Sequence, residues 1–169
     1  MASSSDIPKL LKSIVCPDEA TTLLLAGEMA AVARKGDLIA LTGDLGAGKT
    51  SFARAFIRAL LGDAETEVPS PTFTLVQLYN APKFDVLHTD LYRLKGAEDV
   101  YDLGIEDERE DAVFLVEWPD RMPEGWWLGA LEIRLKRPEG APAGEDEART
   151  VSFHSDAENW AARIGTVSV

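Results

Sequence analysis

The chain has 169 residues, of which 46% are hydrophobic and 27% are charged, and its formal net charge is −12. These values are typical of one soluble globular domain, and no apolar run approaches the roughly 18 residues that a membrane helix needs. The excess of 29 acidic over 17 basic residues argues against a protein that grips nucleic acid unaided, because such proteins normally carry a basic face.

The start of the chain lacks a long apolar run before a small-residue cleavage site, so it does not resemble a secretory signal. We expect residues 1–6 to be a flexible start to a single domain that spans 1–169. Cys16 is the only cysteine, which excludes an internal disulfide and a zinc cluster. These features predict a cytoplasmic protein in which Cys16 is inert, with no attachment to a membrane.

The first third of the chain alternates between helical and strand patterns. Asp18 can cap a helix that runs to about Arg34. Residues 37–42 form a short apolar run, which predicts a strand that is buried on both faces. After a glycine-rich turn, residues 49–61 carry apolar side chains at helical spacing, which predicts an amphipathic helix.

The middle of the chain contains three further strand patterns. Residues 72–79 and 84–89 are predicted strands, and the charged stretch 96–111 is predicted to be partly helical. Ala112–Glu117 reads AVFLVE, which predicts a second buried strand with an acid at its end.

The last third of the chain has a different hydrophobic pattern. Leu131–Lys136 alternates apolar and charged residues, which predicts a strand with one wet face. A Pro/Gly/acid loop at 138–148 leads to an antiparallel partner strand at 149–153 and a helix at 156–164. The sequence as a whole predicts an α/β fold with three layers, a mostly parallel central sheet and an antiparallel C-terminal hairpin.

Residues 43–50 read GDLGAGKT and match the phosphate-loop pattern G-x-x-x-x-G-K-[ST]. A predicted strand precedes this turn and a predicted helix follows it, which is the context that the motif requires. Lys49 would reach the β- and γ-phosphates, and the Thr50 hydroxyl would ligate magnesium. The sequence therefore predicts a P-loop NTPase with ATP and Mg²⁺ as cofactors, held by Gly43, Asp44, Leu45, Gly46, Ala47, Gly48, Lys49, Thr50 and Ser51.

Two acids stand at the ends of predicted strands. Asp90 follows 84–89, and Glu117 ends the strand AVFLVE. Since the C-terminal ends of parallel strands meet at the ligand-binding edge, both acids could hold the metal and orient the attacking water. The alternative is that each acid only caps the following turn. With Lys49, they are the predicted catalytic residues.

Three other features have both a functional and a structural interpretation. The segment SPTFT at 70–74 is either a switch loop that senses the nucleotide or a turn opened by proline. His88 is either a catalytic base or a core histidine. Trp118 either lines the nucleotide site or fills the core.

Four segments, GDLGAGKTSF, SPTFTLV, HTDLYRL and VEWPDR, occur in the order and approximate spacing of the TsaE family, formerly called YjeE. The resemblance covers about residues 18–121. The members are bacterial ATPases of tRNA N6-threonylcarbamoyladenosine (t6A) biosynthesis. The resemblance implies that Thr50, Asp90 and Glu117 surround the magnesium.

The same resemblance implies roles for residues that the motif analysis leaves open. Residues 70–74, including Thr72, would act as a switch, and Trp118 would lie near the nucleotide. A threonine of the first helix, Thr21 or Thr22, would approach the adenine.

The resemblance further implies that the protein works with a TsaD–TsaB complex and meets tRNA only indirectly, through that complex. We expect an ATPase that is slow when isolated. Among rival classes, a regulatory GTPase is disfavoured because no N/T-K-x-D motif follows the phosphate loop. A small-molecule kinase is the main alternative, yet residues 65–117 offer only Arg93 and Arg109 for a lid. A non-catalytic module that binds ATP is a third possibility.

Overall fold

The computed structural model describes residues 8–140 and 147–169, so the expectation of a flexible start at 1–6 lies outside the described residues. In chain order the elements are β1 (Leu10–Cys16), α1 (Glu19–Val32), β2 (Leu38–Thr42), α2 (Lys49–Leu61), β3 (Val76–Tyr79), β4 (Asp85–Asp90), α3 (Ala97–Tyr101), β5 (Ala112–Glu117), β6 (Leu131–Lys136), β7 (Arg149–His154) and α4 (Glu158–Gly165). Three short 3-10 helices complete them: η1 (Glu106–Glu108), η2 (Pro119–Arg121) and η3 (Glu124–Trp127).

The strands form one mixed seven-stranded sheet in the order β1-β7-β6-β2-β5-β4-β3. Its centre is parallel, because β2 pairs in parallel with both β5 and β6, and β4 pairs in parallel with β5. Strands β3, β7 and β1 add antiparallel pairs at the two edges. This arrangement confirms the predicted α/β fold, with its parallel centre and its β6–β7 hairpin.

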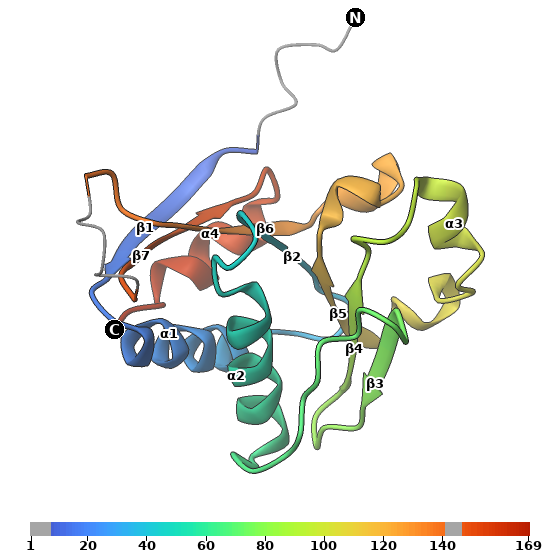
Figure 1. Ribbon diagram of the computed structural model, residues 1–169, viewed down its shortest axis with the longest axis horizontal. Helices are drawn as coiled ribbons and strands as arrows, with labels where there is room; N and C mark the ends of the chain where they lie inside the picture. The colour runs from blue at the N-terminus through green and yellow to red at the C-terminus, as the bar shows by residue number, and fades with distance from the viewer. Residues whose placement is uncertain (1–7, 141–146) are drawn as a thin grey trace, which may run out of the picture.

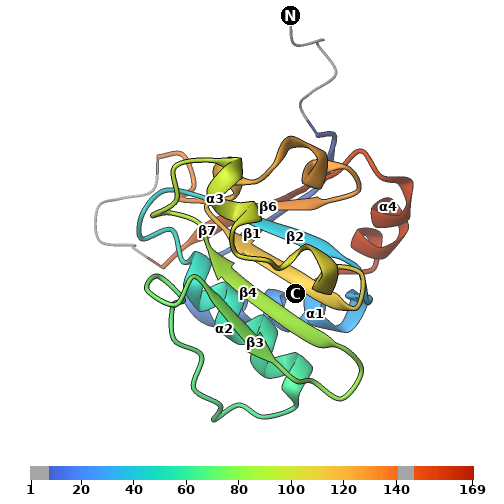
Figure 2. The same cartoon turned by 90° about the vertical axis from the view of Figure 1, so that its right-hand side faces the viewer.

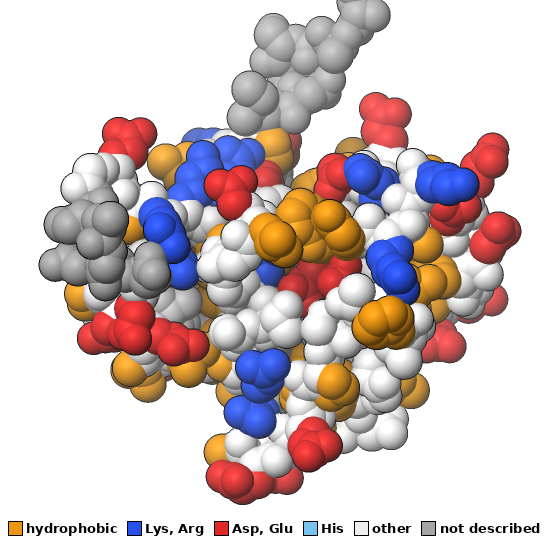
Figure 3. All heavy atoms as spheres, viewed as in Figure 1, with side chains coloured by type: hydrophobic (Ala, Val, Ile, Leu, Met, Phe, Trp, Pro, Cys, Tyr) orange, Lys and Arg blue, Asp and Glu red, His pale blue; other side chains and the backbone are white. Residues whose placement is uncertain are grey.

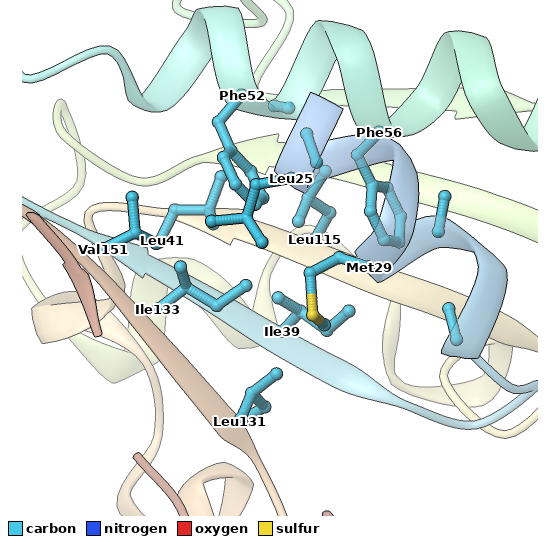
Figure 4. Close-up of a cluster of buried hydrophobic side chains, with 14 of the residues drawn as sticks. Leu25, Met29, Ile39, Leu41, Phe52, Phe56, Leu115, Leu131, Ile133 and Val151 are labelled. Atoms are coloured by element: carbon cyan, nitrogen blue, oxygen red, sulfur yellow. The ribbon is translucent and has the colours of Figure 1, made fainter. Parts of the chain in front are cut away.

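Helices and turns cover the sheet on two sides (Figures 1 and 2). On one side, α1, α2 and α4 contribute to a large core in which Leu25, Phe52 and Phe56 are fully buried with strand residues such as Ile39 and Leu115 (Figure 4). On the other side, α3 and the 3-10 helices cover a smaller core that contains Phe114 and Trp126. The burial of apolar side chains on both sides explains why β2 and β5 are apolar up to their last residues, Thr42 and Glu117.

The helix ends follow the signals in the sequence. Asp18 is the N-cap of α1, and its carboxylate accepts the backbone N–H of Thr21 at 2.7 Å. Gly62 closes α2 in the left-handed conformation that glycine adopts without strain. In the described part of the chain, no helix has the length and apolarity to cross a membrane.

At the edges of the sheet the structure differs from the sequence prediction in two strands. Strand β1 was not predicted, because its exposed edge position leaves Leu10 and Val15 in solvent and blurs the alternation of apolar residues. The prediction of a strand over 72–79 was too long at its start. Leu75 has a positive φ of 65° and donates its backbone N–H to the carbonyl of Pro71, so a turn precedes β3.

The prediction of a wet face on β6 was wrong for most of the strand. Glu132 is only 9% exposed. Its carboxylate accepts hydrogen bonds from Thr42 at 2.9 Å and from two nitrogens of Arg134 at 2.8 and 2.9 Å. The charges of Glu132 and Arg134 therefore pair with each other, and Lys136 at the strand end is exposed.

Candidate nucleotide-binding site

The predicted phosphate loop connects β2 to α2 at the C-terminal edge of the parallel strands. Glu117 lies opposite Leu41 in the β2–β5 pair and opposite Asp90 in the β4–β5 pair. The parallel register therefore places both predicted acids at the same edge as the phosphate loop. This edge is where α/β folds bind ligands.

The loop depends on glycine at positions where a side chain would strain or collide. Gly48 precedes the first residue of α2 with a φ of 100°. A Cβ atom on Gly43 would lie 2.6 Å from the carbonyl oxygen of Leu135. The glycines thus let the loop bend tightly into the N-terminus of α2, where unpaired N–H groups and the helix dipole favour an anion.

Lys49 holds a position inside the loop. Its side chain is buried, and its Nζ donates to the carbonyl oxygens of Gly43 at 2.6 Å and Asp44 at 2.9 Å. The same nitrogen lies 4.2 Å from the ring centroid of Trp118. Burial lowers the pKa of the Lys49 amine, and the nearby carboxylate of Glu117 opposes that effect. Because phosphate oxygens are stronger acceptors than carbonyls, Lys49 can exchange these partners for a nucleotide.

Glu117 is fixed on both of its oxygens. The Thr50 hydroxyl donates to Oε1 at 2.7 Å, and Nε2 of His88 lies 2.7 Å from Oε2. His88 is completely buried, so it cannot reach a substrate. The structural interpretation of His88 is therefore favoured, with the addition that it orients Glu117.

Asp90 is held less tightly than Glu117. Its Oδ1 accepts the backbone N–H of Tyr92 at 2.9 Å, and the Thr72 hydroxyl lies 3.4 Å from Oδ2. Burial raises the pKa of the Asp90 carboxyl, and the neighbouring Glu117 carboxylate adds to the rise. Thr72 also pairs with the Ser70 hydroxyl at 2.8 Å, so the segment 70–74 reaches the site, as its switch interpretation requires.

These groups surround a cavity of about 440 Å³. Figure 3 shows acidic side chains in a hollow in the middle of this face, next to hydrophobic side chains. The cavity lining includes Lys49, Thr50, Thr72, Asp90, Glu117 and Trp118. Trp118 has a positive φ of 56°, and its ring packs against Tyr92 with centroids 4.9 Å apart. The nucleotide-site interpretation of Trp118 is thereby favoured over a core position.

The donor set suits magnesium better than a metal that needs an all-protein cage. Among the described residues, no group of three or more His, Cys, Asp or Glu side chains is placed to hold a metal ion. Mg²⁺ commonly binds through one or two carboxylates together with nucleotide phosphates and water. Thr50, Asp90 and Glu117 offer oxygen ligands of that kind beside the phosphate loop.

A second cavity of about 210 Å³ lies on the other side of the loop, towards the first turn of α1. Thr22 lines it together with Gly46, Gly48 and Ser51, whereas the Thr21 side chain donates to the cap residue Asp18 at 2.6 Å. Of the two candidate threonines, the geometry favours Thr22. The sequence could not separate them, because both fall within the first helical turns.

The sequence analysis missed Arg149. This residue begins β7, yet its Nε donates to the carbonyl oxygen of Ala47 at 2.7 Å and its Nη2 lies 3.3 Å from that of Gly46. Arg149 also lines the second cavity. No local pattern marks it, because the contact spans about a hundred residues of sequence and exists only once the β6–β7 hairpin is placed.

Comparison with known proteins gives consistent matches. Residues 16–145 match the family described as "Threonylcarbamoyl adenosine biosynthesis protein TsaE". The tRNA threonylcarbamoyladenosine biosynthesis protein TsaE of Bacillus subtilis (strain 168) is 38% identical over 140 residues, which cover 82% of this chain and 81% of that protein. The protein of the same name from Rickettsia prowazekii (strain Madrid E) is 40% identical over 103 residues, which cover 61% of this chain and 71% of that protein.

A solved structure extends the match to almost the whole fold. The crystal structure of Bacillus subtilis YdiB superposes with a TM-score of 0.69 at 28% sequence identity, covering 96% of this chain and 97% of that one. The family match and the related sequences agree on one family, and the solved structure shares the fold of this chain. The chain belongs to the TsaE family of threonylcarbamoyl adenosine biosynthesis proteins.

Proposed function

We propose that this protein binds Mg-ATP in the 440 Å³ cavity and hydrolyses it in support of t6A modification of tRNA. The observation that carries the proposal is the convergence of a phosphate loop with a buried acid. The Thr50 hydroxyl, at the start of α2, lies 2.7 Å from Glu117, at the end of β5. P-loop enzymes hold magnesium with a loop hydroxyl and an acid of a neighbouring strand.

Each polar group in the cavity has a role in this proposal. Lys49 would leave the carbonyls of Gly43 and Asp44 to bind the β- and γ-phosphates. Thr50, Asp90 and Glu117 would hold the magnesium, which neutralises charge on the phosphates when bound. His88 would keep Glu117 aimed at the site from behind.

The arginines argue for slow hydrolysis by the isolated protein. Fast P-loop hydrolysis uses an arginine that stabilises charge on the transferring phosphoryl group, an effect of about 10³–10⁵-fold. The guanidinium of Arg93 lies 4.7 Å from the ring centroid of Phe73, and that of Arg109 lies 4.4 Å from Trp126 in the core beside α3. Neither arginine is arranged as a phosphate clamp, which also weighs against a kinase lid.

Since neither Arg93 nor Arg109 is placed to stabilise the transferring phosphoryl group, we expect a protein partner to stimulate hydrolysis. Leu45 of the phosphate loop, which lines the cavity, is 84% exposed, and Phe73 of the segment 70–74 is 82% exposed. Relatives of this chain are named for t6A biosynthesis, and the family resemblance points to a TsaD–TsaB complex as the partner. The net charge of −12 disfavours tRNA as a direct ligand.

The test is a steady-state phosphate-release assay under three conditions: protein alone, protein with tRNA, and protein with a TsaD–TsaB complex. We expect slow release in the first two conditions and clear stimulation in the third. Fast release by the protein alone, or full stimulation by tRNA, would contradict the proposal. Phosphate transfer to a small molecule in a substrate screen would favour the kinase alternative.

A further inference from the structure

The β6–β7 hairpin contacts the phosphate loop at two points, although the loop is built between β2 and α2. The carbonyl oxygen of Leu135 on β6 lies where a side chain on Gly43 would be. On β7, the Arg149 guanidinium donates to Ala47 at 2.7 Å and approaches Gly46 at 3.3 Å, both through loop carbonyls. The guanidinium of Arg149 thereby holds two carbonyls in the second half of the loop from outside.

The direction of these carbonyls decides where the loop amides point. A peptide unit is planar and trans, so its N–H points away from its C=O. With the Ala47 carbonyl held by Arg149, the N–H of Gly48 faces the opposite side of the loop. The peptide between Gly46 and Ala47 has its carbonyl oxygen near Arg149. Its N–H, on Ala47, therefore points the other way and donates to the Asp44 carbonyl at 2.9 Å, which closes the turn.

Amide groups that converge on one point form the anion-binding concavity of a phosphate loop. A guanidinium suits the outer side of such a loop, because its planar fork can hold two neighbouring carbonyls in fixed directions while its charge adds to the positive field. Without such a contact, a glycine-rich loop loses conformational entropy when the ligand orders it, and this loss weakens binding.

We infer that Arg149 is a positioning residue that holds the phosphate loop ready for phosphate, acting through the carbonyls of Gly46 and Ala47. The inference rests on the proposed nucleotide site and deepens it, because it assigns to the C-terminal hairpin a part in phosphate binding. Arg149 need not touch the nucleotide for this role. Its effect should therefore depend on phosphates and not on the base.

The experiment compares Arg149→Gln, Arg149→Lys and wild type by calorimetry with two probes, Mg-ADP and Mg-pyrophosphate. Arg149→Gln should weaken both probes by a similar factor of about tenfold or more, the scale of a lost charged hydrogen bond. Arg149→Lys keeps the charge but loses the fork, so it should lose most of the same affinity. Lys83→Gln removes one positive charge from an exposed position between β3 and β4, outside the phosphate loop and the hairpin, and should bind both probes as wild type does.

Hydrogen exchange of the ligand-free proteins supplies an independent measurement. The amides of residues 46–48 should exchange faster in both Arg149 variants, with exchange in β6 and α2 unchanged. Wild-type affinity of Arg149→Gln for pyrophosphate, wild-type affinity of Arg149→Lys, or unchanged loop exchange would each overturn the inference. Failure of the wild type to bind either probe would instead contradict the proposed nucleotide site, and loop exchange would still decide whether Arg149 orders the loop.

Discussion

Asp90 and Glu117 are neighbours in the sheet register, yet their surroundings stabilise them differently. Glu117 has a partner on each oxygen, from Thr50 and His88. Asp90 is 5% exposed, and its contact with Thr72 is long at 3.4 Å. A buried carboxylate with few partners costs free energy, and such groups concentrate at functional sites.

Asp90→Asn should therefore stabilise the ligand-free protein at neutral pH. Burial raises the pKa of the Asp90 carboxyl above its ordinary value of 3.8, so the folded state binds a proton more readily than the unfolded state does. The charged form destabilises the fold as the pH rises through the raised pKa, and this penalty is absent below the unfolded pKa. We expect a higher Tm for the variant at pH 7, by about 2–4 °C for each kcal/mol regained.

Thermal melts at pH 7 and near pH 4 check this prediction. The gain should shrink towards the lower pH, because a larger fraction of the Asp90 carboxyl is then neutral in wild type. Leu24→Gln, at an exposed α1 position away from the cavity, is a control that should not show this pH dependence. A lower Tm of Asp90→Asn at pH 7 would contradict the account of the buried charge.

At the scale of elements, the sequence predicts the parts of the fold whose signals are local. The bounds of α2 and β5 follow from apolar spacing, and the cap Asp18 locates the start of α1. Strand β1 could not be predicted in this way, because it depends on pairing with β7 more than a hundred residues later. The burial of Glu132 could not be predicted from the sequence either, because Arg134 pairs with its carboxylate only within the folded sheet.

In the candidate site, too, the residues marked by local sequence signals could be predicted and those placed by long-range contacts could not. Lys49, Thr50 and the two acids could be predicted, because a motif and two strand ends converge at one edge of a parallel sheet. Arg149 could not, because its role exists only after the C-terminal hairpin meets the phosphate loop. Long-range side-chain contacts leave no periodic pattern in a sequence.

Helix α4 is attached to the rest of the fold by a buried ion pair. Arg163 donates to both oxygens of Asp37 at 2.7 and 2.9 Å and to the carbonyl of Val32 at 3.0 Å. Its guanidinium carbon also lies 3.6 Å from the ring centroid of Trp160. This one side chain thus connects α4 to the end of α1 and to the residue before β2.

Arg163→Met should lower the free energy of unfolding by about 3–5 kcal/mol, because it leaves the buried Asp37 carboxylate without its cation. Urea denaturation measures the loss. The double variant Asp37→Asn/Arg163→Met should lose less than the single variant, because the uncompensated charge is gone. A loss of under about 1 kcal/mol in the single variant would show that the pair contributes no more than an exposed one.

At the scale of the whole molecule, the fold gathers distant segments around one site. The phosphate loop, the segment 70–74 and the ends of β4 and β5 all line the 440 Å³ cavity, and the C-terminal hairpin supports the loop from outside. The acidic net charge would not prevent the proposed nucleotide binding, because local N–H groups and Lys49 would supply the attraction for phosphate. We expect one nucleotide per chain, bound in this cavity.

Calorimetric titration of Mg-ATP into the wild type and into Lys49→Ala tests the central claim most directly. We expect one site per chain in the wild type and no measurable binding to the variant, because each lost charged hydrogen bond to phosphate costs about 1.5–3 kcal/mol. A circular dichroism spectrum and a Tm close to wild type would confirm that the variant is folded. Equal ATP affinity of the two proteins, or no binding to the wild type, would contradict the assignment of this cavity as the nucleotide site.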